Sequence, residues 1–196
     1  MTHARKVPRI VVVYFSATGT TAKLAEAIHV GATVSASVDL CQIVGDDIAL
    51  GRFQNDAIMS VADAADVIVF GSPTYMGGPA AQFKAFADAT SDRWSEQRWA
   101  NKVAAGFTIG SCPNGDQTHT LTYFTVLAAQ HGMLWCGLDL PGGQDHNCRN
   151  RLGSQTGLMT HTIDGKLPDP DLDTAQYLGR RLAKLAAKNC GGALSV

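Results

Sequence analysis

The stretch Ile10–Thr21 constrains the fold of this chain more than any other part of its sequence. A continuous run of β-branched and aromatic residues, Ile10–Phe15, is typical of a strand that is buried on both faces in a parallel sheet. The run ends at Ser16-Ala-Thr-Gly-Thr-Thr21, and a helix is predicted from about Thr20 to Val30. A buried strand that passes through a glycine turn into a helix predicts an α/β fold.

Strand-like and helix-like segments alternate along the rest of the chain. We expect further strands at Val38–Ile43, Val67–Phe70, Lys102–Ile109 and Met133–Leu138. Further helices are expected at Asp56–Ala65, Ala80–Ala89, Gln117–His131 and Asp171–Lys188, with an irregular segment at Pro141–Pro170. This alternation predicts one domain over residues 1–196, with three α/β/α layers and a five-stranded parallel sheet in the order 2-1-3-4-5.

The composition excludes several classes of protein. The 16 Lys and Arg residues against 17 Asp and Glu give a net charge of −1, which does not suit a nonspecific nucleic-acid binder. A basic cluster between Arg180 and Lys188 lies at the end of the last predicted helix, where cations stabilise the helix dipole. The five cysteines are scattered and lack any Cys-x-x-Cys pair, which favours free thiols and a cytoplasmic location.

The hexamer Ser16–Thr21 is a candidate anion site. A helix start presents unpaired N–H groups and the positive end of the helix dipole, and the hydroxyls in this hexamer add donors. It contains no Lys or Arg, and neither a GxxxxGK[ST] loop nor a GxGxxG fingerprint is present. Two interpretations stay open: a neutral site for one phosphate monoester, or an ordinary Ser/Thr helix cap followed by a glycine turn.

Two further loops follow the third and fourth predicted strands. Gly71–Pro79 contains three Gly and two Pro, and Thr74 with the neighbouring amides is a candidate to bind a planar heterocycle against Tyr75 or Met76. Thr108–Asp116 is the second loop. At the carboxyl edge of a parallel sheet both meet the hexamer, where the switch-point rule places a ligand crevice. Each loop alone also fits a plain connection, and the ordered combination predicts the site.

These segments together resemble the flavodoxin-like, WrbA-type NAD(P)H:quinone oxidoreductases, which are related to NADPH-dependent FMN reductases. The resemblance rests on Ser-x-Thr-Gly-x-Thr, Gly-Ser-Pro-Thr-Tyr-Met-Gly-Gly-Pro, Gly-Asp-Gln and His-Gly-Met, in matching order from about Ile10 to Leu138. It implies an enzyme with FMN as cofactor, NADH or NADPH as co-substrate and a quinone-type acceptor. It also implies a homo-oligomer, a dimer or tetramer, in which neighbouring subunits contribute to each active site.

The resemblance further implies site residues by position. The FMN phosphate would be held by Ser16, Ala17, Thr18, Gly19, Thr20 and Thr21. The isoalloxazine ring would be flanked by Pro73, Thr74, Tyr75, Met76, Gly77, Thr108, Ile109, Gly110, Gly115 and Asp116. His131 matches the family histidine that lies near the flavin in the oligomer, and it would donate a proton to the quinone. It also precedes Gly132 and fits a plain role at a helix end.

Other features leave alternatives open. Tyr75 stands where the best-known members carry Arg, which removes a cationic contact. No metal site is expected, because Asp145, His146 and Cys148 are too few for a zinc signature. Five aromatic residues suit either an oligomer interface or the core: Trp94, Trp99, Tyr123, Phe124 and Trp135. The alternative functions are a flavodoxin-type electron carrier, against which the net charge argues, and a scaffold protein without flavin.

Overall fold

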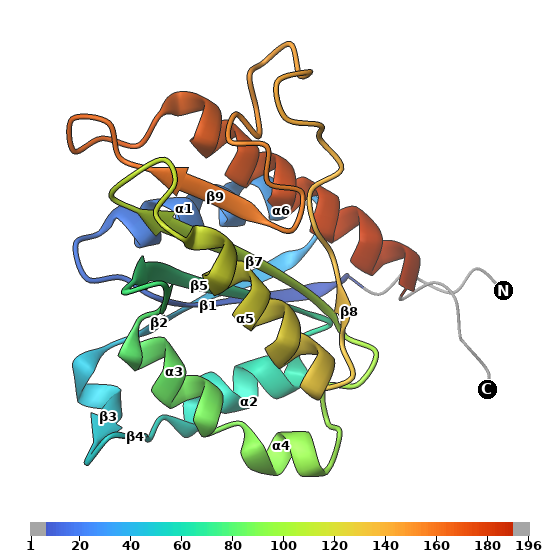
Figure 1. The fold of residues 1–196 in the computed structure, drawn as a ribbon. Coiled ribbons are helices and arrows are strands. Elements are labelled where there is room, and N and C mark those ends of the chain that lie inside the picture. The colour runs from blue at the N-terminus through green and yellow to red at the C-terminus, as the bar shows by residue number, and fades with distance from the viewer. Residues whose placement is uncertain (1–6, 190–196) are drawn as a thin grey trace, which may run out of the picture.

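The computed structural model describes residues 7–189. Residues 1–6 and 190–196 of the predicted domain, with Cys190, lie outside the described residues. A mostly parallel sheet forms the middle layer of three (Figure 1). Helices α1 (Thr20–Ala32) and α6 (Asp169–Asn189) cover one face of it. The other face is covered by α2 (Asp56–Ala64), α3 (Ala81–Asp88) and α5 (Gln117–Gln130), and the short α4 (Ser91–Ser95) follows α3.

The main sheet has the strand order β2-β1-β5-β7-β8, and these neighbours pair in parallel. Its strands are β1 (Arg9–Phe15), β2 (Ser37–Ile43), β5 (Val67–Tyr75), β7 (Val103–Gly110) and β8 (Leu134–Trp135). The predicted order 2-1-3-4-5 and the predicted flavodoxin-like fold class are confirmed. Because these strands run in parallel, the carboxyl ends of β1, β5 and β7 meet at one edge of the sheet.

Burial explains why the run Ile10–Phe15 becomes the inner strand β1. Its side chains alternate between two apolar clusters: Ile10 and Val12 pack on the α1–α6 side, and Val11 and Val13 on the side of α2, α3 and α5. All four are fully buried. A strand enclosed on both faces has no polar positions, as its sequence predicted.

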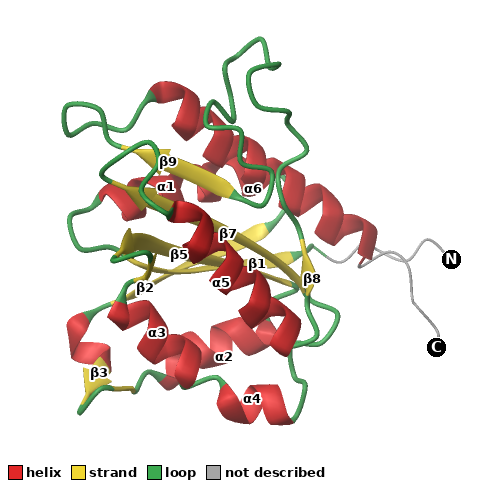
Figure 2. Cartoon of the chain, in the orientation of Figure 1, coloured by secondary structure: helices red, strands yellow, loops and turns green. Residues whose placement is uncertain are grey.

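The predicted fifth strand, Met133–Leu138, is wrong in its extent. Only Leu134 and Trp135 pair with β7, and a separate strand, β9 (Leu158–His161), pairs with the distal half of β7. The intervening residues 136–157 leave the sheet as a long loop (Figure 2). Leu138 stays buried, but its N–H donates to the carbonyl oxygen of Gln155, 2.8 Å away, instead of to β7. Burial alone therefore did not specify which segment completes the ladder.

The predicted loop Gly71–Pro79 is a β-hairpin. Thr74 and Tyr75, at the end of β5, pair with β6 (Gly78–Pro79), so β5 extends beyond the predicted Phe70 and α3 begins at Ala81. A similar small hairpin joins β3 (Ile48–Ala49) to β4 (Arg52–Phe53), after a 3-10 turn at Gly45–Asp47. Within residues 7–189, no helix is long and apolar enough to cross a bilayer.

Candidate functional site

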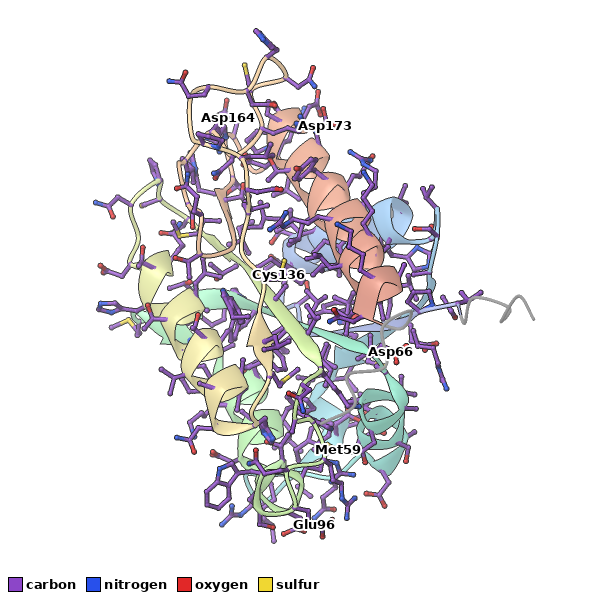
Figure 3. The ribbon with its side chains drawn as sticks, turned by 90° about the vertical axis from the view of Figure 1, so that its right-hand side faces the viewer. Met59, Asp66, Glu96, Cys136, Asp164 and Asp173 are labelled. Atoms are coloured by element: carbon purple, nitrogen blue, oxygen red, sulfur yellow. The ribbon has the colours of Figure 1, made fainter. Side chains whose placement is uncertain are left out.

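A cavity of about 410 Å³ opens where β1, β5 and β7 end. It is lined by Ala17, Thr18, Thr20, Thr21, Pro73, Thr74, Tyr75, Ile109, Gly110, Ser111, Thr162 and Gly165. Its volume is typical of a small-molecule site, and none of these lining residues carries a charge. Figure 3 shows Asp164, the neighbour of Gly165, near the top of the view, and Glu96, which follows α4, at the bottom.

The start of α1 forms the first wall of the cavity. Gly19 caps the helix in the left-handed conformation, with φ +87°, and a Cβ added there would meet nothing within 4 Å. The Ser16 hydroxyl accepts hydrogen bonds from the N–H groups of Gly19 and Ala22, each at 3.2 Å. The N–H groups of Thr20 and Thr21 have no acceptor among residues 7–189. Free amides, threonine hydroxyls and the helix dipole attract an anion here without any cation.

The second wall of the cavity is formed by the ends of β5 and β7, and a chain of three threonine hydroxyls lies beneath it. Thr108 Oγ1 donates to the carbonyl oxygen of Ser72 at 2.7 Å, and Thr74 Oγ1 lies 2.8 Å from both Thr108 Oγ1 and Thr120 Oγ1. A hydroxyl has one proton, so Thr74 donates to Thr108 and Thr120 donates to Thr74. The Thr74 proton is therefore committed inside the protein. A ligand meets the main chain of Thr74 or the remaining lone pair of its hydroxyl.

The tip of the β5–β6 hairpin lies beside this wall. Met76 and Gly77 have φ values of +48° and +78°, which is typical of a two-residue type I′ turn. The Met76 side chain is fully exposed, whereas Tyr75 is about half exposed and lines the cavity. The structure therefore directs Tyr75, and not Met76, toward a ligand in the cavity.

The remaining wall is assembled from segments distant in sequence. Ser111 begins the loop after β7, and Thr162 and Gly165 belong to the turn after β9, where Ile163 bridges to Lys166. This turn also has two left-handed residues, Asp164 and Gly165. Thr162 and Gly165 were missed by the sequence analysis. The available signal was the Asp164-Gly165 pair after a run of strand-forming residues, which is a recognised turn sequence.

Comparison with known proteins assigns the chain to a family. Residues 8–138 match the family model described as NADPH-dependent FMN reductase. The chain belongs to this family. Flavodoxin FldP of Pseudomonas aeruginosa is 37% identical over 185 residues, covering 90% of this chain and 96% of that protein. An NAD(P)H dehydrogenase (quinone) of Archaeoglobus fulgidus is 32% identical over 197 residues, covering 93% and 99%.

A solved structure described as the flavodoxin, WrbA-like protein from Agrobacterium tumefaciens has a TM-score of 0.73 and 38% identity, covering 92% of this chain and 98% of that one. The predicted family and the predicted type of enzyme agree with these relatives.

Several predicted site residues of this FMN reductase family member lie outside the cavity lining. Ser16, Gly19 and Thr108 support the walls from behind through the contacts described above, and Gly115 and Asp116 precede α5. Asp116 caps α5 in the left-handed conformation, with φ +59°. The carboxylate of Asp145 accepts hydrogen bonds from both Nε and Nη2 of Arg149. The structure thus brings together part of the predicted set and assigns the rest to supporting positions.

His131 lies far from the cavity. It follows the last residue of α5, whose 14 residues span about 20 Å from the cavity end of the helix. The imidazole is 1% exposed and stacks on Trp99, with 4.5 Å between ring centroids. Trp99 and Phe124 are likewise fully buried, so these two belong to the core of the chain.

The hydrogen bonds of His131 define its tautomer. Thr90 Oγ1 donates its only proton to the carbonyl oxygen of Ala87 at 2.7 Å, so His131 Nε2, 2.9 Å away, must donate to Thr90. Nδ1 is then a bare acceptor, and it is buried without a partner among the described residues. Burial lowers the pKa of His131 from 6.5 to about 4. The ring is neutral near neutral pH, and His131 is the C-cap residue of α5.

Proposed function

We propose that this protein is an FMN-dependent oxidoreductase that passes two electrons from NADH or NADPH to a quinone-type acceptor. The carrying observation is the uncharged anion site at the start of α1, which opens directly into a cavity at the switch point of the sheet. The family match and the quinone-reducing relatives support the same reaction.

The residues present fit FMN. Its phosphate would bind to the N–H groups of Thr20 and Thr21 and to the hydroxyl of Thr18, which is exposed and lies 3.4 Å from the hydroxyl of Thr20. The ring would lie between the main chain of Pro73–Tyr75 and that of Ile109–Ser111. When bound, FMN supplies the transfer of a hydride equivalent from the nicotinamide and of two electrons to the quinone.

The protein's own contribution is binding, orientation and access. The threonine chain beneath Thr74 holds the second wall in one geometry, because all three protons in it have fixed acceptors. Tyr75 is half-exposed where it lines the cavity, and we assign the approach of the second substrate to this side. No charged side chain lines the cavity, so main-chain dipoles provide its electrostatics.

One anaerobic experiment tests this function. The FMN-loaded protein is mixed with NADH or NADPH in a stopped-flow instrument, and a benzoquinone is added afterwards. We expect the flavin absorbance to be lost with at least one nicotinamide and to return with the quinone. If the protein binds FMN but neither NADH nor NADPH reduces it, the result would contradict the proposed oxidoreductase activity.

A second candidate is an electron carrier of the flavodoxin type without its own substrate. It is favoured by the 37% identity to a relative named a flavodoxin. If the protein is such a carrier, we expect in the same experiment that nicotinamides do not reduce its bound FMN directly and that dithionite reduces it fully. A preparation that does not bind FMN would contradict both candidates.

We also propose a cytoplasmic homo-oligomer, a dimer or tetramer. The location is supported by Cys41, Cys112, Cys136 and Cys148, which form no disulfide. The proton-donor role of His131 stays a prediction, because it requires a second copy of the chain and an opening around the buried ring. Comparison of His131→Ala with the wild type in both half-reactions tests it. A slower transfer to the quinone would support the role, and unchanged rates would leave only the structural one.

A further inference from the structure

The wall of the cavity that follows β7 is held by a side chain which the function does not otherwise use. Gln117, the first residue of α5, is 2% exposed, and its amide folds back over the preceding turn. Its Oε1 accepts from the N–H of Gly115 at 2.6 Å, and its Nε2 donates to the carbonyl oxygen of Cys112 at 2.8 Å. A Cβ at Gly110 would lie 2.6 Å from this Nε2, so the glycine leaves the space that the amide occupies.

The same amide reaches strand β9. Gln117 Nε2 lies 3.4 Å from the carbonyl oxygen of Thr160, which is paired with Ile109 in the sheet. The amide orientation is fixed by chemistry, because a main-chain N–H requires the oxygen and two carbonyls require the nitrogen. Thr160 itself is fully buried. Its hydroxyl donates to Oδ2 of Asp171 in the first turn of α6.

Asp171 is held in turn by Arg151, at the end of the long loop between β8 and β9. Arg151 Nε and Nη2 donate to the two carboxylate oxygens of Asp171 at 2.9 and 2.8 Å. The Asp171 side chain is 2% exposed and that of Arg151 is 23% exposed. Arg151 Nη2 also lies 3.1 Å from Nδ1 of His161, the residue paired with Gly110. A buried carboxylate requires such partners, so α6, the long loop and β9 are fixed relative to one another here.

We propose that this connected set, Arg151–Asp171–Thr160–Gln117, positions the loop Ser111–Asp116 for flavin binding. Thr160, Asp171 and Gln117 are positioning residues, since none of them lines the cavity. The set joins the loop to two elements more than 30 residues away in sequence. Without this set, the main chain of Cys112 and Gly115 would lose the hydrogen bonds that shape the turn. The main-chain amides next to the flavin ring would then no longer be held in one direction. The inference rests on the proposed flavin site and deepens it.

The sharpest test is a pair of substitutions at one position. Thr160→Val keeps the volume and removes the hydroxyl, whereas Thr160→Ser keeps the hydroxyl. Arg149→Met is the matched control, because it breaks the Arg149–Asp145 ion pair of the same long loop and the contact of Arg149 with the Tyr177 ring, and neither contact belongs to the proposed set. Two quantities are measured: the dissociation constant of FMN by quenching of its fluorescence, and hydrogen exchange of the Cys112–Asp116 amides in the flavin-free protein.

We expect Thr160→Val to weaken FMN binding by about five- to tenfold, the effect of losing one buried hydrogen bond, and to speed exchange at Cys112–Asp116. Thr160→Ser restores both, and Arg149→Met changes neither. Gln117→Leu removes the side-chain amide that holds the turn, and it should weaken FMN binding more than Thr160→Val does. Asp171→Asn is the less decisive variant, because it removes the buried carboxylate that pairs with Arg151 and so also affects folding.

Wild-type affinity and wild-type exchange in Thr160→Val would overturn the inference. Equal losses in Thr160→Val and Arg149→Met would also overturn it, because they would reflect general loosening of the loop. If the wild type does not bind FMN, the proposed function fails, and the exchange data still decide whether Thr160 positions the turn.

Discussion

At the carboxyl ends of the strands, Thr20 and Thr21 line the cavity, and their N–H groups have no acceptor within residues 7–189 and remain available to a ligand. At the opposite end of α5, His131 is enclosed by Trp99 and Thr90, and its Nδ1 has no partner in the part of the chain that the structure describes. One end of the sheet leaves polar groups free where a ligand can reach them. At the other end, the polar groups bond to one another inside the core. Substitutions at the first end should therefore change ligand binding, and substitutions at the second end should change the stability of the fold.

The largest expected effect comes from the closed end and concerns pH. The folded-state pKa of His131, about 4, lies below the unfolded value of 6.5. The unfolded chain therefore binds the proton more readily, and the contribution of the neutral ring is complete above pH 6.5 and is lost as the pH falls toward 4. The loss is on the order of 2 to 3 kcal/mol in the free energy of unfolding.

Urea unfolding at a series of pH values measures this loss. His131→Gln cannot titrate, so its stability should fall less than that of the wild type between about pH 7 and about pH 4. His146→Gln, at an exposed position, is the control and should follow the wild type. Parallel pH profiles for the wild type and His131→Gln would contradict the prediction.

The second prediction concerns the open end. Gly19→Val places a β-branched residue at φ +87°, where L-residues are strained by about 1 to 3 kcal/mol. Relief of the strain turns the amides of the first turn away from the phosphate, so we expect FMN binding to weaken about 10- to 100-fold. Gly45→Ala is the control, because that glycine has no positive φ and its Cβ would meet nothing. Unchanged FMN affinity in Gly19→Val would show that the phosphate binds elsewhere.

The smallest effect compares two hairpin tips. Met76-Gly77 near the cavity and Leu50-Gly51 in the β3–β4 hairpin both have positive φ values, and both apolar side chains are fully exposed. Asn tolerates this conformation better, so Met76→Asn and Leu50→Asn should each raise the free energy of unfolding by about 0.5 to 1 kcal/mol. Thermal unfolding measures the gain, and FMN affinity should stay unchanged in both. A weaker affinity in Met76→Asn alone would show that Met76 packs on the ring, which is one of the two alternatives, Tyr75 or Met76, that the sequence left open.

Local sequence was sufficient for β1, for the helices α1, α2, α3, α5 and α6, and for the first wall of the site. The run Ile10–Phe15 is typical of a strand enclosed on both faces, and the hexamer after it supplies both the turn and the donors. These features depend on neighbours along the chain, and hydrophobic burial with glycine stereochemistry determines them.

The tertiary structure alone decided the rest. Met133–Leu138 and Leu158–His161 are both apolar enough to complete the sheet, and the return path of the long loop divides the edge position between them. The chain of threonine hydroxyls, the hydrogen bonds of the Gln117 amide and the burial of His131 likewise depend on groups that meet only after the layers pack. Hydrogen bonds are short and directional, so a sequence pattern that reports burial cannot specify which donor will face which acceptor.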